Sequence, residues 1–560
     1  MFKKSKANQP TIFEGLDMLL NKKGQKLISN PGIWFNLFRT QVYDRIDEEL
    51  FSVLFDPIMG RSNSSVRLLV GMIILKEGFQ ITDEQLFMSC ELDLGYRKAL
   101  GLHNIDEEIP VPATYYDFKR KIHEHYEITG TSLMNEAFLQ ITTEQVSEFS
   151  VGGKKIRLDS KLIQSNIARC TRLGLIIKTI QKFLKCHESG MLSTLDKKWR
   201  LMAEAILASS SDNQQFGLSD LAKQEKLIEL GKMIKAMLVN SKLKGVKEYN
   251  LLKRLFEEQY YISGKGKIMV KENKVISADS LQSPHDPDAA YRKKGNQNGS
   301  GTQTVNGYCA NITETCNHKK DEPKLDFIVS AEVGSAVKQD GEFLYVAIKD
   351  SKTTTGELPE SLITDGGYSN NEEEQKIKSE FPEITHIKTG LVGRMGEMEY
   401  IMDESNEPQY IFHRGIKKKV IIVQKKDGSK IYKIKDKKQN SGFRYISHDQ
   451  IAYHFKRKEL ENMPIDIKNI RPPIESTINQ VFCGLEGNKS KYRGLAKTIS
   501  YVISRCIWTN FRRIEDKICK KGKWKGLFSK IYNTIFYKIY DAEIQINSII
   551  KYRLTTAIYN

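Results

Sequence analysis

Three carboxylates, each in its own local context, constrain this chain more than any other feature of its sequence. Asp159 lies in IRLDSKLIQSN, Asp365 in LITDGGY and Glu475 in IRPPIESTINQVF. The first two occur with short apolar runs that predict strands, and the third follows a Pro-Pro pair of the kind that opens helices. Distant acids that a fold brings together hold hard divalent cations, because Mg²⁺ prefers carboxylate and water oxygen. The pattern therefore predicts a metal-dependent site suited to phosphodiester chemistry.

The chain is long and strongly basic. At 560 residues it exceeds a single ordinary core, so about two to four structural units are expected. It carries 87 Lys and Arg against 69 Asp and Glu, a formal net charge of +18. Such an excess favours an anionic polymer or a membrane surface as partner. The alternative is a lysine-rich solvated surface with no such partner.

Cysteine usage and hydropathy bear on the compartment. The 8 cysteines are scattered, and no C-x-x-C motif occurs. This argues against a zinc module or a disulfide framework and fits a reducing cytosol. The start, MFKKSKANQPTIFEG, has no apolar segment after its charges, so no signal peptide is predicted. The longest apolar run, Leu68 to Leu75, is much shorter than the ~20 residues of a membrane span. We therefore expect a soluble cytoplasmic protein with no membrane partner.

The first 150 residues predict helices. Apolar residues recur at helical spacing through SSVRLLVGMIILKEGFQITDEQLFMSCELDLGYRKALGL, and Thr82 is the expected N-cap of one helix. A Gly78-containing turn between two helices, followed by PATYYDFKRKIHEHY, is compatible with a helix-turn-helix DNA-binding unit. A plain helical bundle fits the pattern equally well.

Beyond residue 150, strand-like and helical segments alternate. Strands are predicted at 154–163, in NGYCANITET and KLDFIVSAEVG, and around SLITDGGY and EITHIKTG, with a short helix at GEFLYVAIKD. Residues from about 164 to 262 interrupt them with apolar helical stripes, which indicates a helical insertion. An acid at a strand end before Gly366 suggests an α/β sheet with its site at the strand ends.

A basic segment precedes the last acid. KKVIIVQKKDGSKIYKIK predicts a β-hairpin that turns at Asp427-Gly428. Between Arg414 and Lys438 there are eleven Lys or Arg and two acids. We interpret this window as a DNA contact, and the alternative is a solvated edge strand protected by lysine. The segment after residue 474 is predicted to be helical, and it ends in interleaved basic and aromatic residues.

Each acid taken alone has a simpler explanation. Asp159 fits an exposed strand position, Asp365 fits a turn before glycines, and Glu475 fits a first-turn glutamate that complements the helix dipole. Asp286 and Asp288 in SPHDPDAAYRKKG form a competing pair. They sit in a Pro-rich loop, where turn-building is the simpler account.

In combination, the motifs resemble the bacterial DDE transposases encoded by insertion sequences, in the insertion-sequence-four/five-like superfamily. The resemblance rests on GRSNSSVRLLVGMIILKEGFQITDEQL, VPATYYDFKRKI, DSKLIQSNIAR, SPHDPDAAYRKKG with NGYCANITET, DGGYSN, RPPIESTINQVF and YRGLAKTISYVISRCIWTNFRRI, in this order. It implies an α/β fold: an RNase H-like mixed-sheet core with a helical N-terminal domain. It also implies a helical insertion after the first strand and a basic β-rich insertion before the helix of the catalytic glutamate.

The resemblance also implies a site. Asp159, Asp365 and Glu475 are expected to be the catalytic residues and the ligands of two Mg²⁺ (or Mn²⁺) ions. Arg471 matches an arginine that accompanies the glutamate in related transposases. Where relatives often carry tyrosine before that arginine and lysine seven residues after the glutamate, this chain has Lys468 and Phe482. The expected DNA-binding residues are Arg471, Lys417, Lys418, Lys419, Lys425, Lys426, Lys489, Lys491 and Arg493.

The expected activity is cut-and-paste DNA transposition by a homodimer on double-stranded DNA, with terminal inverted repeats and target DNA as substrates, in the bacterial cytoplasm at the nucleoid. The alternatives are a non-catalytic or decayed sequence-specific DNA-binding protein and a stand-alone RNase H-like nuclease. The expected divisions are 1–150 (helical, DNA-binding), 151–163 with 263–394 (core, first part), 164–262 (helical insertion), 395–465 (basic β-rich insertion), 466–515 (core helices) and 516–560 (basic and aromatic helices).

Overall fold

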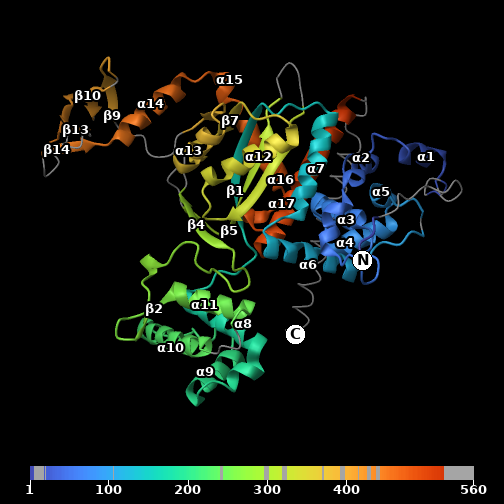
Figure 1. Ribbon diagram of the computed structural model, residues 1–560, viewed down its shortest axis with the longest axis horizontal. Coiled ribbons are helices and arrows are strands. Elements are labelled where there is room, and N and C mark those ends of the chain that lie inside the picture. Colours follow the sequence, from blue (N-terminus) through green and yellow to red (C-terminus); the bar gives the residue numbers. More distant parts are fainter. Residues whose placement is uncertain are drawn as a thin grey trace, which may run out of the picture.

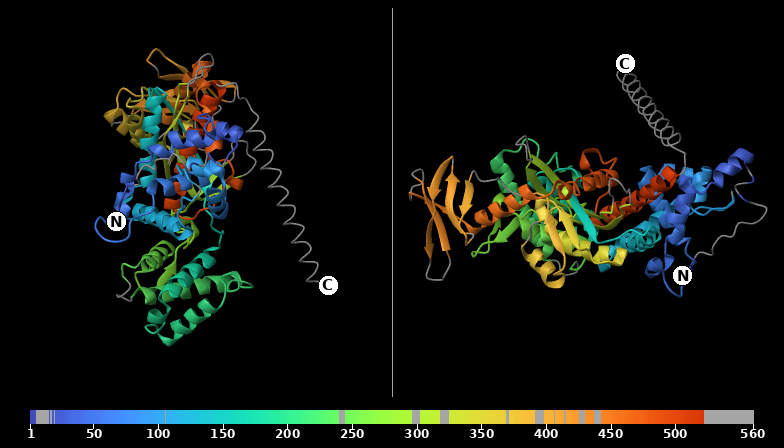
Figure 2. Two further views of the ribbon diagram at one scale, coloured as in Figure 1. Left: turned by 90° about the vertical axis from the view of Figure 1, so that its right-hand side faces the viewer. Right: turned by 90° about the horizontal axis from the view of Figure 1, so that it is seen from above.

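The computed structural model describes residues 1–521, with gaps at 5–14, 16–17, 19, 105, 240–243, 296–301, 318–324, 369–370, 391–397, 406, 414, 425–429 and 437–441. Figure 1 shows a body built on a mixed sheet, with a helical lobe below it and a small β-rich lobe beyond one end. The two lobes project from the body in different directions (Figure 2). The chain is thus a mixed α/β protein.

The body is organised around one six-stranded sheet. Its order is β4-β5-β1-β7-β8, and β6 also pairs with β5. Strands β1 and β7 are parallel, as are β7 and β8, whereas β5 is antiparallel to β1, β4 and β6. The strands are β1 (Lys155–Gln164), β4 (Ala290–Gly295), β5 (Thr302–Thr315), β6 (Ile328–Ser335), β7 (Ser361–Thr364) and β8 (Thr385–Lys388). The strands predicted at β1, β5, β6, β7 and β8 are therefore confirmed, whereas β4 was not predicted.

Helices cover both faces of the sheet. Ile156 and Leu158 of β1 pack on one face with α12 (Leu344–Thr355) and α13 (Asn371–Glu380). Because side chains alternate along a strand, Arg157 and Asp159 point to the opposite face. That face meets α16 (Pro472–Val481) and α17 (Leu495–Lys521). The first acid thus lies on the side of the sheet that carries the helix of Glu475.

The N-terminal helices share the core of this second face. One hydrophobic cluster joins α2, α3, α6 and α7 to α16, α17 and the sheet. These and the neighbouring elements are α1 (Lys22–Ile28), α2 (Trp34–Gln41), η2 (Tyr43–Arg45), η3 (Glu48–Leu54), α3 (Val66–Phe79), α4 (Asp83–Leu92), α5 (Leu94–Ala99), α6 (Pro112–Thr129) and α7 (Leu133–Glu148). Helix α17 therefore packs against both the N-terminal helices and the sheet (Figure 1).

One local prediction in this region is wrong. Gly78 lies inside α3 rather than in a turn. It is a glycine for a packing reason, since a Cβ there would come within 2.3 Å of the Trp508 indole. The turn that follows is made by Gln80, which has a left-handed backbone with φ of 59°. The predicted N-cap Thr82 is confirmed, and its side chain forms a capping box with Gln85 at the start of α4.

The helical lobe has its own core. It contains α8 (Arg172–Leu192), α9 (Lys197–Ala208), α10 (Asp220–Leu238) and α11 (Lys247–Gln259), whose apolar side chains form a separate cluster. A two-stranded ribbon of β2 (Tyr260–Ile262) and β3 (Ile268–Val270) packs on α10 and α11. The lobe thus folds around its own apolar residues, between β1 and β4 in sequence.

The β-rich lobe contains two three-stranded sheets that share a small core. One has β9 (Met398–Met402), β10 (Pro408–His413) and β11 (Ile416–Lys419), and the other has β12 (Ile421–Gln424), β13 (Lys430–Lys435) and β14 (Phe443–Ile446). The predicted hairpin is confirmed as β12 and β13, and its Asp427-Gly428 turn lies outside the described residues. Lys418 and Lys419, predicted within that hairpin, belong instead to β11 of the neighbouring sheet.

A helix returns the chain from the β-rich lobe to the body. It is α14 (His448–Asn462), followed by the short α15 (Ile465–Lys468) just before α16. Residues 448–462 are thus helical, although they fall in the segment predicted as β-rich. Among the described helices, none combines the length and the apolar character that a membrane crossing requires.

Candidate functional site

Asp159 and Asp365 stand level with each other on adjacent parallel strands. The register pairs Arg157 of β1 with Ile363 of β7, and each acid lies two residues further along. Asp365 directly follows β7, and one of its carboxylate oxygens accepts the N–H of Gly367 at 2.8 Å. Asp159 accepts its own neighbour's N–H, that of Ser160, at 2.8 Å. Strand pairing therefore places two acids side by side.

Glu475 reaches the same place from α16. Pro472 and Pro473 occupy the first positions of this helix, where a missing N–H costs nothing because that donor has no helical acceptor. Glu475 lies in the first turn, and α16 packs against β1. Its side chain is 59% exposed, compared with 14% for that of Asp159. The carboxylate of Glu475 is thus open to solvent while that of Asp159 faces the sheet.

One guanidinium joins all three acids. Arg471 Nη2 lies 2.9 Å from Asp159 Oδ2 and 3.8 Å from Asp365 Oδ2, and Arg471 Nη1 lies 3.1 Å from Glu475 Oε1. The acids predicted as a triad therefore converge, although they come from two strands and a helix. Three carboxylates against one guanidinium leave an excess of negative charge when all are ionised.

The electrostatics of Asp159 reflect this crowding. The pKa of Asp159 is raised to about 6, mainly by burial and to a smaller extent by the neighbouring carboxylates of Asp365 and Glu475. The Arg471 guanidinium and the Ser160 N–H act in the opposite direction. The site thus gathers more carboxylate charge than its single arginine offsets.

A fourth carboxylate borders the site and escaped the sequence analysis. Ser160 donates a hydrogen bond to Asp340 Oδ1 at 2.7 Å. A Cβ on Gly367 would lie 3.0 Å from Asp365 Oδ1 and 3.1 Å from Asp340 Oδ2, so both acids crowd this glycine. Arg292 Nη2 lies 3.8 Å from Asp340. An aspartate that opens a short helix after a strand is common, and nothing in its local sequence marks it as a site residue.

The donor set fits a hard divalent cation. Carboxylate oxygens are the ligands that Mg²⁺ prefers, and the excess negative charge at Asp159, Asp365 and Glu475 is what such an ion would neutralise. Within the described part of the chain, no three His, Cys, Asp or Glu side chains stand in a ready ligating arrangement. The Arg471 guanidinium lies against all three carboxylates instead. In this structure the arginine side chain therefore holds the acids together.

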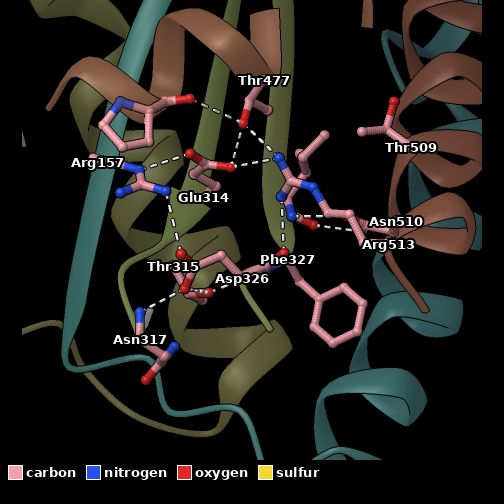
Figure 3. A network of polar contacts seen from close by, with 12 residues as sticks. Arg157, Glu314, Thr315, Asn317, Asp326, Phe327, Thr477, Thr509, Asn510 and Arg513 are labelled. Atoms are coloured by element: carbon pink, nitrogen blue, oxygen red, sulfur yellow. Dashed lines mark hydrogen bonds and ion pairs between the residues drawn. The ribbon is translucent and has the colours of Figure 1, made fainter. Parts of the chain in front are cut away.

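A buried network of polar contacts supports the site between the sheet and the helices that cover it (Figure 3). Arg157 donates to Glu314 Oε1 at 2.6 Å, to the Ile470 carbonyl at 3.0 Å and to Asp326 Oδ2 at 3.2 Å. Glu314 is completely buried and also accepts the Thr477 hydroxyl at 2.6 Å. β1, β5 and α16 are thus tied together next to the three acids.

Three of the predicted DNA-binding residues lie on a loop at the end of β1. Lys489, Lys491 and Arg493 are exposed and follow α16. Ser490 N–H donates to the Gln164 carbonyl at 2.8 Å, and Arg493 Nε donates to the Asn166 carbonyl at 2.6 Å. Gln164 is five residues beyond Asp159, or about 16 Å along an extended strand.

The other predicted basic residues are elsewhere. Lys417, Lys418 and Lys419 lie on β11 in the β-rich lobe, which Figure 1 shows beyond α14 and away from the sheet. Lys425 and Lys426 lie outside the described residues. The structure therefore brings together the three acids and Arg471, and it does not place β11 among them.

Phe482, which stands where related transposases often carry lysine, and the competing acids Asp286 and Asp288 all have structural roles. Phe482 ends α16 and is buried in the main core, so a hydrophobic contact replaces the expected lysine. Asp286 is fully buried and accepts the hydroxyls of Ser165 and Tyr308. Asp288 accepts the backbone N–H of Leu495 at the start of α17. The competing acid pair thus anchors a loop and caps a helix.

Comparison of the chain with protein-family models, with curated proteins and with solved structures found no match. A functional conclusion therefore depends on the residues of the site and on their arrangement.

Proposed function

We propose that this chain is a DDE transposase that cleaves DNA at transposon ends and joins the freed 3′-hydroxyl to target DNA. The observation that carries the proposal is the convergence of Asp159, Asp365 and Glu475 on Arg471. A mixed sheet with two acids on adjacent parallel strands and a third on a covering helix supports an RNase H-like assignment.

Asp159, Asp365 and Glu475 would hold Mg²⁺ (or Mn²⁺), which supplies Lewis-acid activation of water and of phosphate oxygens when bound. The carboxylates also orient the nucleophile. In the first step a water oxygen bonds to phosphorus, the P–O3′ bond breaks, and a 3′-hydroxyl is released. In the second step this hydroxyl attacks a target phosphodiester and displaces the target strand's own 3′-oxygen. The attacking hydroxyl gives its proton to solvent, and the displaced 3′-oxygen takes one up. Arg471 is placed to contact a phosphate once its carboxylate partners are otherwise neutralised.

A basic path from the site toward the N-terminal helices supports DNA as the substrate. It starts at Lys489, Lys491 and Arg493 and continues to Lys497. The pKa of Lys119 on α6 is lowered mainly by burial, and the charge of nearby Lys497 adds to this effect. Lys119 lies 5.0 Å from the Tyr115 ring centroid and 5.9 Å from that of Tyr492. Cations arranged in this way neutralise successive phosphates without reading bases. Cleavage of two transposon ends in one complex would require at least a dimer on DNA, at the bacterial nucleoid.

The test uses the full chain and a duplex that carries the inverted repeats flanking its gene. We expect Mg²⁺- or Mn²⁺-dependent cleavage at the repeat ends, followed by joining to a supercoiled plasmid. Binding without cleavage would assign the chain to the non-catalytic DNA-binding proteins. Cleavage without joining would assign it to the stand-alone nucleases.

A further inference from the structure

Glu314 is an unusual residue for the interior of a sheet. It lies on β5, its side chain is 0% exposed, and it directly faces Arg157 in the β1–β5 register. A buried carboxylate is costly unless charged and hydrogen-bonded partners surround it. The partners of Glu314 therefore indicate the structural role of this buried carboxylate.

Those partners come from three different elements (Figure 3). Arg157 of β1 donates to Oε1, and Arg513 of α17 lies 2.9 Å from Oε2. The Thr477 hydroxyl of α16 donates to Oε2 and itself accepts a hydrogen bond from Arg513. Glu314 is thus the common acceptor for one strand and both helices on this face.

The contacts bracket the candidate ligands. Arg157 precedes Asp159 by two residues, and Thr477 follows Glu475 by two residues. Arg157 also holds the carbonyl of Ile470, the residue before Arg471. Both ends of the segment from Arg471 to Glu475 are therefore fixed to β1 through the Arg157–Glu314–Thr477 chain of hydrogen bonds.

The charges within the network balance. Glu314 and Asp326 face Arg157 and Arg513, so the group has no net charge to impose on the acids. Its effect on the site is geometric.

We propose that Glu314, acting through Thr477 and Arg157, is a positioning residue that sets the distance of Glu475 from Asp159. This inference rests on the proposed function, because it treats these acids as ligands of one metal centre. Partners that orient the direct ligands of a metal typically contribute about 10- to 100-fold to its affinity.

Thr477→Val tests the proposal without removing the buried charge. The variant loses the hydroxyl that connects α16 to Glu314 and keeps the side-chain shape. We expect about a 10-fold loss of Mn²⁺ affinity in the DNA-free protein, measured by isothermal titration calorimetry. Thr477→Ser keeps the hydroxyl and should restore the affinity.

Thr509→Val is the matched control. Thr509 lies on α17 apart from the dashed contacts of the network (Figure 3). It is buried, and its hydroxyl donates to the Arg505 carbonyl of its own helix at 2.8 Å. Thr477→Val should lower the melting temperature more than Thr509→Val, because it removes a hydrogen bond to a buried carboxylate. Only Thr477→Val should weaken Mn²⁺ binding. Wild-type Mn²⁺ affinity in Thr477→Val would overturn the proposal, as would an equal loss in both variants.

The experiment separates this inference from the proposed function. If Asp159→Asn weakens Mn²⁺ binding but the wild type never cleaves DNA, transposition fails and the Thr477 comparison still decides the positioning role. If Asp159→Asn leaves Mn²⁺ binding unchanged, or the wild type binds no Mn²⁺, there is no metal centre to position and the inference falls.

Discussion

Arg471 donates to Asp159 at 2.9 Å across 312 positions of sequence. The contact joins the start of a helix to the middle of a strand, and the same guanidinium reaches Asp365 and Glu475. Arg471 therefore acts as the internal counter-ion of the acidic centre.

Removing this counter-ion should change the titration of its partner. With Arg471 in place, the pKa of Asp159 is about 6, because burial raises it more than the guanidinium lowers it. Arg471→Gln should therefore move the pKa of Asp159 above 6, measured by carboxyl ¹³C NMR on the metal-free protein. Lys468→Gln is the control, because Lys468 lies on α15 and donates to the Glu461 carbonyl of α14 at 3.3 Å. An unchanged titration in Arg471→Gln would contradict the role of Arg471.

The three acids should be needed for chemistry and dispensable for DNA binding. We expect Asp159→Asn, Asp365→Asn and Glu475→Gln each to reduce cleavage to background, because each removes a charged oxygen ligand. Affinity for the inverted repeats should stay within about two-fold by gel shift, since phosphate contacts dominate binding. Asp466→Asn, at an exposed position on α15, should cleave normally. Substantial activity in any of the three variants would remove that residue from the catalytic set.

The lysines of β11 should contribute to DNA affinity by neutralising phosphates. Replacing Lys417, Lys418 and Lys419 by Gln should weaken binding and lower the slope of log affinity against log salt by up to about 2.7, or ~0.9 for each phosphate that is no longer neutralised. The matched control replaces three lysines of the helical lobe that lie near a carboxylate: Lys198, Lys223 and Lys253. If the slope does not change in the β11 variant, this strand faces solvent in the complex.

Lys119 should lower the stability of the folded protein and increase its affinity for DNA. Burial lowers the pKa of Lys119 to about 8. Between about pH 8 and 10.5 the unfolded chain holds the proton that the folded chain has released, so stability should rise with pH across this window. Below pH 8 the partly buried ammonium destabilises the fold. Lys119→Met should therefore raise stability at pH 7 by on the order of 2 kcal/mol and weaken DNA binding.

Denaturant unfolding at pH 7 and pH 9 checks the stability change, and a salt titration of DNA binding checks the affinity. Lys121→Met is the control on the same helix, where Lys121 forms an ion pair with Asp117 at 3.1 Å. A destabilised Lys119→Met, or one that binds DNA as tightly as the wild type, would exclude this role.

Local patterns predicted much of the fold. Apolar alternation located β1, β5, β6, β7 and β8, and the proline pair located the start of α16. The acids were identified because each follows such a signal and because their order resembles that of a known family. The i, i+4 spacing of Arg471 and Glu475 is also visible in sequence, whereas the contacts of Arg471 with two strands depend on tertiary packing.

The residues missed lack any local signature. Glu314 is one polar position in NITET, and only the register of β5 against Arg157 gives it a partner. Asp340 looks like an ordinary helix-start acid until Gly367 brings Asp365 beside it. Gly78 was taken for a turn residue because the ring that requires it, that of Trp508, lies more than four hundred positions away.

The attachment of the helical lobe has a consequence for how such a chain can change. Gln164 at the end of β1 and Ala290 at the start of β4 both pair with Gly307 of β5, so they lie about 10 Å apart across it. The chain leaves and rejoins the sheet at nearly one point, and the α8–α11 unit between them keeps its apolar residues to itself. The α8–α11 unit could therefore be lengthened, replaced or deleted in favour of a short linker. Such a change would leave the core that supports the three acids intact.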